Sequence, residues 1–134
     1  MMQFDSICVI DDDPIVVFGI RKMLQGAFPD ATFTSYENGK VALDHLSAAV
    51  ASASPLPRHI LLDINMPIMD GWQFLDAFIR LPITEPMDIT IITSSIDPAD
   101  LQQWETFRGL THHRLEFRNK PIKKEDLIAI VRAA

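Results

Sequence analysis

The sequence contains very little cysteine and few basic residues. Its 134 residues include one cysteine, and 12 Lys and Arg stand against 18 Asp and Glu, which gives a net charge of -6. Cys8 lies inside an apolar run, which predicts a small buried core residue and not a reactive thiol. The absence of a disulfide framework favours a reducing, cytoplasmic setting. Because the basic residues are scattered, direct nucleic-acid binding is not expected.

Long apolar runs are also missing. No uninterrupted run approaches the roughly 18 residues that a membrane helix needs. The N-terminal letters MMQFDS lack the basic start and following apolar stretch of an export signal. We therefore expect no membrane contact and no export. A chain of 134 residues, 48% of them hydrophobic, has the size of one ordinary domain, so we expect a single domain over residues 1–134.

Short apolar runs alternate with stretches of helical periodicity along the whole chain. The runs predict strands at 6–10, 32–36, 59–63, 88–93 and 115–119. The periodic stretches predict helices at 14–28, 38–53, 71–81, 97–107 and 123–134. This alternation predicts an α/β fold with a five-stranded parallel sheet, because each parallel crossover needs a helix. In such sheets ligands bind beyond the carboxyl ends of the strands.

Polar residues follow four of these predicted strands. In chain order they are Asp11, Asp12 and Asp13, then Asp63, then Thr93, Ser94 and Ser95, and finally Lys120. Like charges about 4 Å apart repel by roughly 4 kcal/mol at an effective dielectric near 20, so such a cluster favours a bound cation. Mg²⁺ is usually held by one or two carboxylates with waters and phosphate oxygens. An aspartate beside it can act as nucleophile, while a hydroxyl and a lysine bind the phosphoryl oxygens.

These motifs resemble the receiver domain of two-component response regulators. They are the acidic pair Asp11 and Asp12, the segment DINMPIMDG from Asp63 to Gly71, the hydroxyl residue Thr93, and the dipeptide KP that begins at Lys120. Each motif alone is weak, but the four occur in the family's order at strand ends. The resemblance implies a flavodoxin-like, doubly wound sheet with strand order 2-1-3-4-5 and five helices.

The resemblance also implies a role for each site residue. Asp63 is the expected phosphoacceptor, assisted by Lys120 and Thr93. Asp12 and Asp63 are expected to bind Mg²⁺ directly. Asp11 would bind it through a water molecule, and Asn65 would bind it through its backbone carbonyl. No other cofactor is implied, and the only expected catalysis is the protein's own phosphorylation and dephosphorylation.

A conformational switch and its partners follow from the same resemblance. The Thr93 hydroxyl is expected to move toward the phosphoryl group while Phe117 rotates inward behind it. The phosphoryl donor would be a histidine kinase or phosphotransfer protein. A downstream protein would contact the face formed by the fourth helix, fifth strand and fifth helix, and a homodimer through these elements is an open alternative. With no output domain before Ala134, the chain is expected to be a stand-alone receiver or the receiver half of a longer regulator.

Several residues have a simpler structural interpretation. Asp13 before Pro14, and Asp70 before Gly71, suit helix caps and turns. Trp72 and Trp104 are expected to be packing anchors. The four histidines show no metal-ligand spacing, so each is expected to be solvated or to cap a helix. They are His45, His59, His112 and His113.

Three other functions compete with the receiver. An aspartyl-phosphate phosphatase would want a second acid two residues after its nucleophile, where Asn65 stands. A flavin or nucleotide carrier would want a glycine-rich loop after the first strand, which is absent. A phosphorylation-independent interaction module on the same fold stays open. The segment 106–114 is longer than the family pattern and would reshape the partner face, while the polar Arg118 suits an exposed edge strand.

Overall fold

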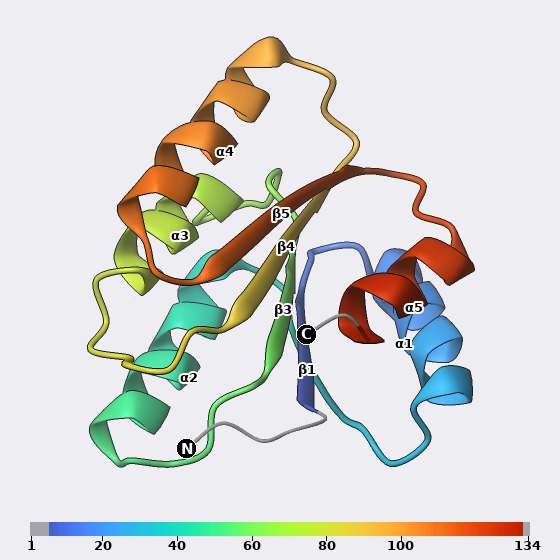
Figure 1. Cartoon of the computed structure of the whole chain (residues 1–134), viewed down its shortest axis with the longest axis horizontal. Coiled ribbons are helices and arrows are strands. Elements are labelled where there is room, and N and C mark those ends of the chain that lie inside the picture. The colour runs from blue at the N-terminus through green and yellow to red at the C-terminus, as the bar shows by residue number, and fades with distance from the viewer. Residues whose placement is uncertain (1–5, 133–134) are drawn as a thin grey trace.

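The computed structural model describes residues 6–132 and contains one five-stranded parallel sheet (Figure 1). Its strands are β1 (Ser6–Ile10), β2 (Thr32–Tyr36), β3 (His59–Leu62), β4 (Asp88–Thr93) and β5 (Arg114–Asn119). The helices between and after them are α1 (Pro14–Ala27), α2 (Gly39–Ala51), α3 (Gly71–Phe78), α4 (Pro98–Leu110) and α5 (Lys124–Arg132). The strand order β2-β1-β3-β4-β5 confirms the predicted fold class. Residues 1–5 and 133–134, including the predicted end of the last helix, lie outside the described residues.

Helices cover both faces of the sheet, with α1 and α5 on one side and α2, α3 and α4 on the other (Figure 1). Alternate residues of β1 show the reason. Cys8 and Ile10 join the core under α2 and α3, whereas Ile7 and Val9 join the core under α1 and α5. A strand buried on both faces needs an unbroken apolar run, which is why these strands were visible in the sequence. Burial raises the pKa of the Cys8 thiol to about 12, as expected for an inert core residue.

Aspartates are the N-cap residues of three helices, each in the loop that follows the carboxyl end of a strand. Asp13 accepts a hydrogen bond from the Ile15 N–H at 2.9 Å, and Asp97 caps α4 in the same way. Asp70 and Gln73 form a reciprocal capping box at the start of α3. The predicted caps at Asp13 and Asp70 are therefore confirmed. These caps fix the positions of the loops that carry the polar residues of this edge.

Two of the histidine predictions are wrong. His59 is 4% exposed and His113 is 3% exposed, so neither is solvated. His113 instead accepts the Met87 N–H at its Nδ1 atom, 2.9 Å away, and thereby ties the chain before β4 to the chain before β5. Its position beside buried strand ends, and not its own polarity, decides its burial. The other two histidines, His45 and His112, are exposed.

The remaining expectations concern packing at α4 and the edges. Trp72 stacks on Phe107 and Trp104 donates its indole N–H to the Leu115 carbonyl, which confirms both as packing residues. Helix α4 continues to Leu110, three residues beyond its predicted end, and so takes up part of the long 106–114 segment. β5 is an edge strand, as predicted. No helix within residues 6–132 has the length and apolarity needed to cross a bilayer.

Candidate functional site

Three carboxylates meet where β1 and β3 end. These strands are neighbours, and the Asp63 N–H donates to the Ile10 carbonyl at 2.9 Å, just before Asp11. One carboxylate oxygen each from Asp11, Asp12 and Asp63 lies within 4.8 Å of the others. Asp11 and Asp63 are 5% and 6% exposed, whereas Asp12 faces solvent. The acidic cluster is therefore present as predicted, and Asp13 is separate from it.

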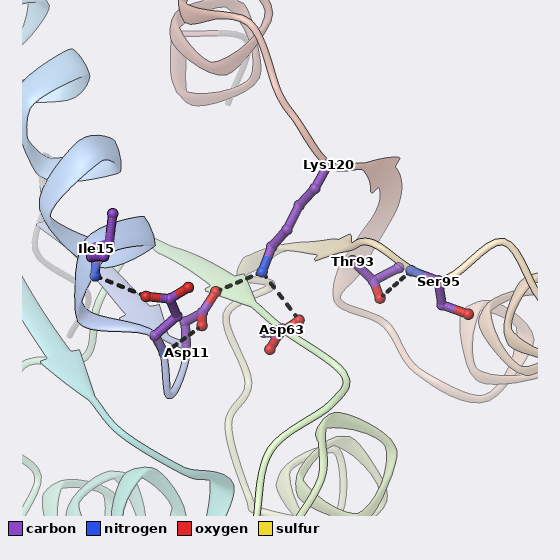
Figure 2. Close-up of polar contacts among 7 residues, drawn as sticks. Asp11, Ile15, Asp63, Thr93, Ser95 and Lys120 are labelled. Atoms are coloured by element: carbon purple, nitrogen blue, oxygen red, sulfur yellow. Dashed lines mark hydrogen bonds and ion pairs between the residues drawn. The ribbon is translucent and has the colours of Figure 1, made fainter.

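Lys120 reaches into this cluster from the end of β5 (Figure 2). Its Nζ atom lies 3.0 Å from Asp11 Oδ2 and 3.4 Å from Asp63 Oδ1. Burial raises the pKa of Asp63, the charge of Asp11 raises it further, and Lys120 opposes both effects. Burial lowers the pKa of Lys120, but its hydrogen bonds and ion pairs, first with Asp11 and then with Asp63, outweigh burial and leave the pKa above its usual value. One cation thus contacts two of the three carboxylates, and the site keeps an excess of negative charge.

This donor set fits a hard divalent cation. All three acidic side chains offer oxygen, and their spacing allows more than one to reach a single ion. Burial and the charge of Asp11 raise the pKa of Asp63, and a bound cation would oppose both effects. Magnesium is the ion that such carboxylates most often hold beside a phosphate group.

A close approach of α3 fixes the backbone at Asp63. The Gly71 N–H donates to the Ile64 carbonyl at 2.8 Å. A Cβ atom on Gly71 would lie 2.5 Å from the Asp63 carbonyl oxygen and 2.9 Å from Ile64 Cα. Sequence reasoning assigned Gly71 to turn and cap chemistry and missed this contact. A glycine at the first position of a helix, where it has no intrinsic advantage, was the available signal.

The loop between Asp63 and Gly71 has several exposed residues and is locally strained. Ile68 has a φ of 71°, a left-handed conformation that β-branched residues rarely adopt, and its side chain is 80% exposed. Asn65 lies in the same loop with an exposed side chain. Its predicted role depends on its backbone carbonyl, for which the structure describes no hydrogen bond.

Thr93 is completely buried at the end of β4. Its hydroxyl oxygen accepts the Ser95 N–H at 3.1 Å and is turned toward Ser95 (Figure 2). Within residues 6–132 it makes no hydrogen bond with Asp63. The Thr93 carbonyl accepts the Lys120 N–H at 2.8 Å, so the two predicted site residues are held side by side by the backbone.

Phe117 occupies the middle of β5. Its side chain is half-buried, and its ring centroid lies 6.1 Å from that of Trp104 on α4. The structure therefore brings Asp11, Asp12, Asp63 and Lys120 together, with Thr93 at the same edge of the sheet. Phe117 contacts α4 through Trp104.

The family model for the response regulator receiver domain matches residues 7–132. Among curated proteins, the chain is 27% identical over 126 residues to "Probable methanogenesis regulatory protein FilR2" of Methanothrix harundinacea, covering 87% of this chain and 78% of that protein. It is 29% identical over 133 residues to the DNA-binding transcriptional regulator NtrC of Escherichia coli. That match covers 99% of this chain but 25% of NtrC, so this chain spans about a quarter of that relative.

Solved structures give the same result. A two-component response regulator from Cytophaga hutchinsonii superposes with a TM-score of 0.77 at 26% identity, covering 96% of this chain and 95% of that one. The Mn²⁺-bound form of response regulator Rcp1 superposes with a TM-score of 0.75 at 22% identity, covering 96% and 90%, which supports the fold alone. With the sheet order, the acidic cluster and the match over residues 7–132 taken together, the chain belongs to the response regulator receiver domain family of two-component signalling.

Proposed function

We propose that this receiver accepts a phosphoryl group on the carboxylate of Asp63. The observation that carries the proposal is the position of Lys120 Nζ, 3.0 Å from Asp11 and 3.4 Å from Asp63, beside two buried carboxylates. Family membership disfavours the phosphatase and flavin-carrier alternatives. Asp12 and Asp63 would bind Mg²⁺ directly, with Asp11 acting through water and Asn65 through its carbonyl.

The chemistry assigns a separate task to each side chain. An oxygen of Asp63 attacks the phosphorus of a phosphohistidine, the P–N bond breaks, and the imidazole of the donor leaves with the bonding electrons. Lys120, held by Asp11, offers a positive charge to the phosphoryl oxygens. The Thr93 hydroxyl donates to another phosphoryl oxygen once it has turned away from Ser95. When bound, Mg²⁺ neutralises the carboxylates and phosphoryl oxygens as they approach. Beyond this phosphorylation and its reversal, we propose no catalysis.

Exposed apolar side chains around the same edge support docking of a protein donor. They lie at the start of α1, in the loop after β3 and in the loop after β4, and are Ile15, Phe18, Ile68 and Ile96. Their exposed fractions range from 61% for Phe18 to 92% for Ile96. Apolar side chains gathered at one functional edge suit a protein partner. A histidine kinase or a phosphotransfer protein is the proposed donor.

The output would leave through α4, β5 and α5. A phosphoryl group adds about 1.5 to 2 negative charges and three acceptor oxygens, which is enough to bias a loop with two arrangements. Movement of Thr93 would change the position of Phe117, which packs against Trp104 of α4. The surface of these elements is the proposed contact for a downstream protein or a second copy of the chain.

The deciding experiment is incubation with acetyl phosphate and Mg²⁺ followed by intact-mass measurement. We expect wild-type protein to gain the mass of one phosphoryl group and Asp63→Asn to gain none. Asp76→Asn, which changes an exposed aspartate of α3 paired with Arg80, is the matched control and should behave as wild type. An adduct on the Asp63→Asn protein would contradict the assignment. The absence of both an adduct and Mg²⁺-dependent beryllofluoride binding in wild type would favour a phosphorylation-independent interaction module.

A further inference from the structure

A chain of hydrogen bonds connects Thr93 to helices α3 and α4. The Ser95 N–H donates to the Thr93 hydroxyl oxygen at 3.1 Å. The Ser95 hydroxyl donates to Oδ2 of Asp100, in the first turn of α4. The other oxygen of that carboxylate accepts the indole N–H of Trp72, on α3, at 2.9 Å. Asp100 thus links the loop that follows Thr93 to helix α3.

Trp72 contacts α4 at a second point. Its ring stacks on Phe107 with centroids 5.7 Å apart and planes inclined by 2°. Phe107 is buried, and Trp72 and Asp100 are half-buried. The stack positions the indole so that its N–H meets Asp100. A charge-assisted hydrogen bond that is partly shielded from water is stronger than an exposed one.

Ser95 is the centre of this arrangement, because every polar group it offers is engaged. Besides the two bonds above, its hydroxyl oxygen accepts the Asp97 N–H at 3.2 Å. Its carbonyl accepts the Asn119 side-chain amide at 2.7 Å. Ser95 therefore ties the loop between β4 and α4 to β4, to the start of α4 and to Asn119 of β5. The Thr93 hydroxyl is held at Ser95 and away from Asp63 (Figure 2).

We propose that Asp100 is a latch that holds the β4 to α4 loop in the resting arrangement, through Ser95 and Trp72, and that phosphorylation works against it. The inference rests on the proposed role of Thr93 as a ligand for the phosphoryl group. Asp100 touches neither the phosphoryl group nor Asp63, so it is a positioning residue that acts through Ser95. By linkage, the latch weakens phosphoryl binding at Asp63, and phosphorylation weakens the bond between Trp72 and Asp100 to the same extent.

The test measures Mg²⁺-dependent beryllofluoride binding by titration calorimetry. Releasing one charge-assisted hydrogen bond of the resting arrangement should tighten binding by up to about tenfold. We expect this gain in Asp100→Ala and Ser95→Ala. Trp72→Phe should show it too, because it keeps a ring against Phe107 and removes only the N–H donor. Glu105→Ala, which removes an exposed acid from α4, is the matched control and should bind as wild type.

A double variant and tryptophan fluorescence separate the latch from a general loosening of α4. If Trp72 acts only through Asp100, the double variant Trp72→Phe with Asp100→Ala should bind no more tightly than Asp100→Ala alone. The chain has two tryptophans, so Trp104→Phe leaves Trp72 as the sole reporter. Its emission should change when beryllofluoride binds. In the same background, Asp100→Ala should show the changed emission before any addition.

The outcomes distinguish the latch from the proposed function. Wild-type protein that binds beryllofluoride as tightly as all three variants overturns the latch and leaves the proposed function standing. Wild-type protein that binds none overturns the proposed function and the latch with it. If Asp100→Ala does not fold, judged by circular dichroism, Trp72→Phe carries the decision alone, and unchanged binding in that variant overturns the latch.

Discussion

The two ends of the sheet carry ionic clusters of opposite balance, and the cluster at the amino end is the more exposed of the two. At the carboxyl end, Lys120 faces Asp11 and Asp63. At the amino end, one carboxylate, Asp88 of β4, faces two arginines. Arg58 lies 3.7 Å from it, and Arg114 of the neighbouring strand donates to both of its oxygens, with Nη2 2.9 Å from Oδ2.

The difference separates a structural ion cluster from a binding site. At the amino end, the hydrogen bonds that Arg114 donates to Asp88 raise the pKa of Arg114. At the carboxyl end burial and Asp11 raise the pKa of Asp63, so its charged form is disfavoured. In an ion cluster with only a structural role, charges of one sign are compensated by charges of the other sign within the protein. A surplus of buried charge of one sign indicates that a ligand completes the site.

The largest expected effect comes from Gly71→Ala, which tests how closely α3 packs against the backbone of Asp63 at the carboxyl end of the sheet. The new Cβ would lie 2.5 Å from the Asp63 carbonyl oxygen, a backbone atom that cannot move without disturbing the site. We expect a loss of about 3 kcal/mol in the free energy of unfolding, measured by urea denaturation.

Gly19→Ala is the control for this substitution. Gly19 lies inside α1, and an added Cβ there would meet no heavy atom within 4 Å. Its helix should be unchanged or stabilised by up to about 1 kcal/mol. Equal losses in the two variants would contradict the packing explanation.

The sequence predicted the carboxyl end better than the amino end. The meeting of Asp11, Asp63 and Lys120 could be predicted because each lies at the end of a predicted strand, and parallel strands bring their carboxyl ends to one edge. The burial of His113 could not be predicted, because it depends on how the chain before β4 packs beside β5. The bond between Trp72 and Asp100 was missed for the same reason, since it depends on how α3 and α4 lie together.

One substitution made at both ends should have opposite effects. In Mg²⁺-free buffer, Asp63→Asn removes a disfavoured charge and should raise the free energy of unfolding by about 1 kcal/mol. Asp88→Asn leaves two arginines without their shared carboxylate and should lower it by about 1–2 kcal/mol. Thermal or urea unfolding of both proteins measures the difference.

Magnesium sharpens this test. The ion should stabilise wild type and Asp88→Asn equally, and it should stabilise Asp63→Asn much less, because a ligand is missing. A loss of stability in both variants would mean that the carboxyl end is also balanced in the absence of a cation, against the interpretation given above.

The smallest expected effect is the pH response of the amino end. His113 accepts the Met87 N–H at Nδ1, so its proton is on Nε2, which has no partner within the described chain. Burial, and then the neighbouring His112, lower the pKa of His113 to about 4. The His113 side chain binds a proton near pH 6.5 in the unfolded chain but not in the folded protein. The stability that His113 contributes is therefore fully present above pH 6.5 and is lost as the pH decreases toward 4. Between pH 7 and 5.5, the free energy of unfolding measured in urea should fall by about 1 kcal/mol more in wild type than in His113→Gln. In His112→Gln, which changes an exposed residue, the free energy of unfolding should fall nearly as much as in wild type. Equal losses in wild type and His113→Gln would assign the acid response to the carboxylates of the opposite end.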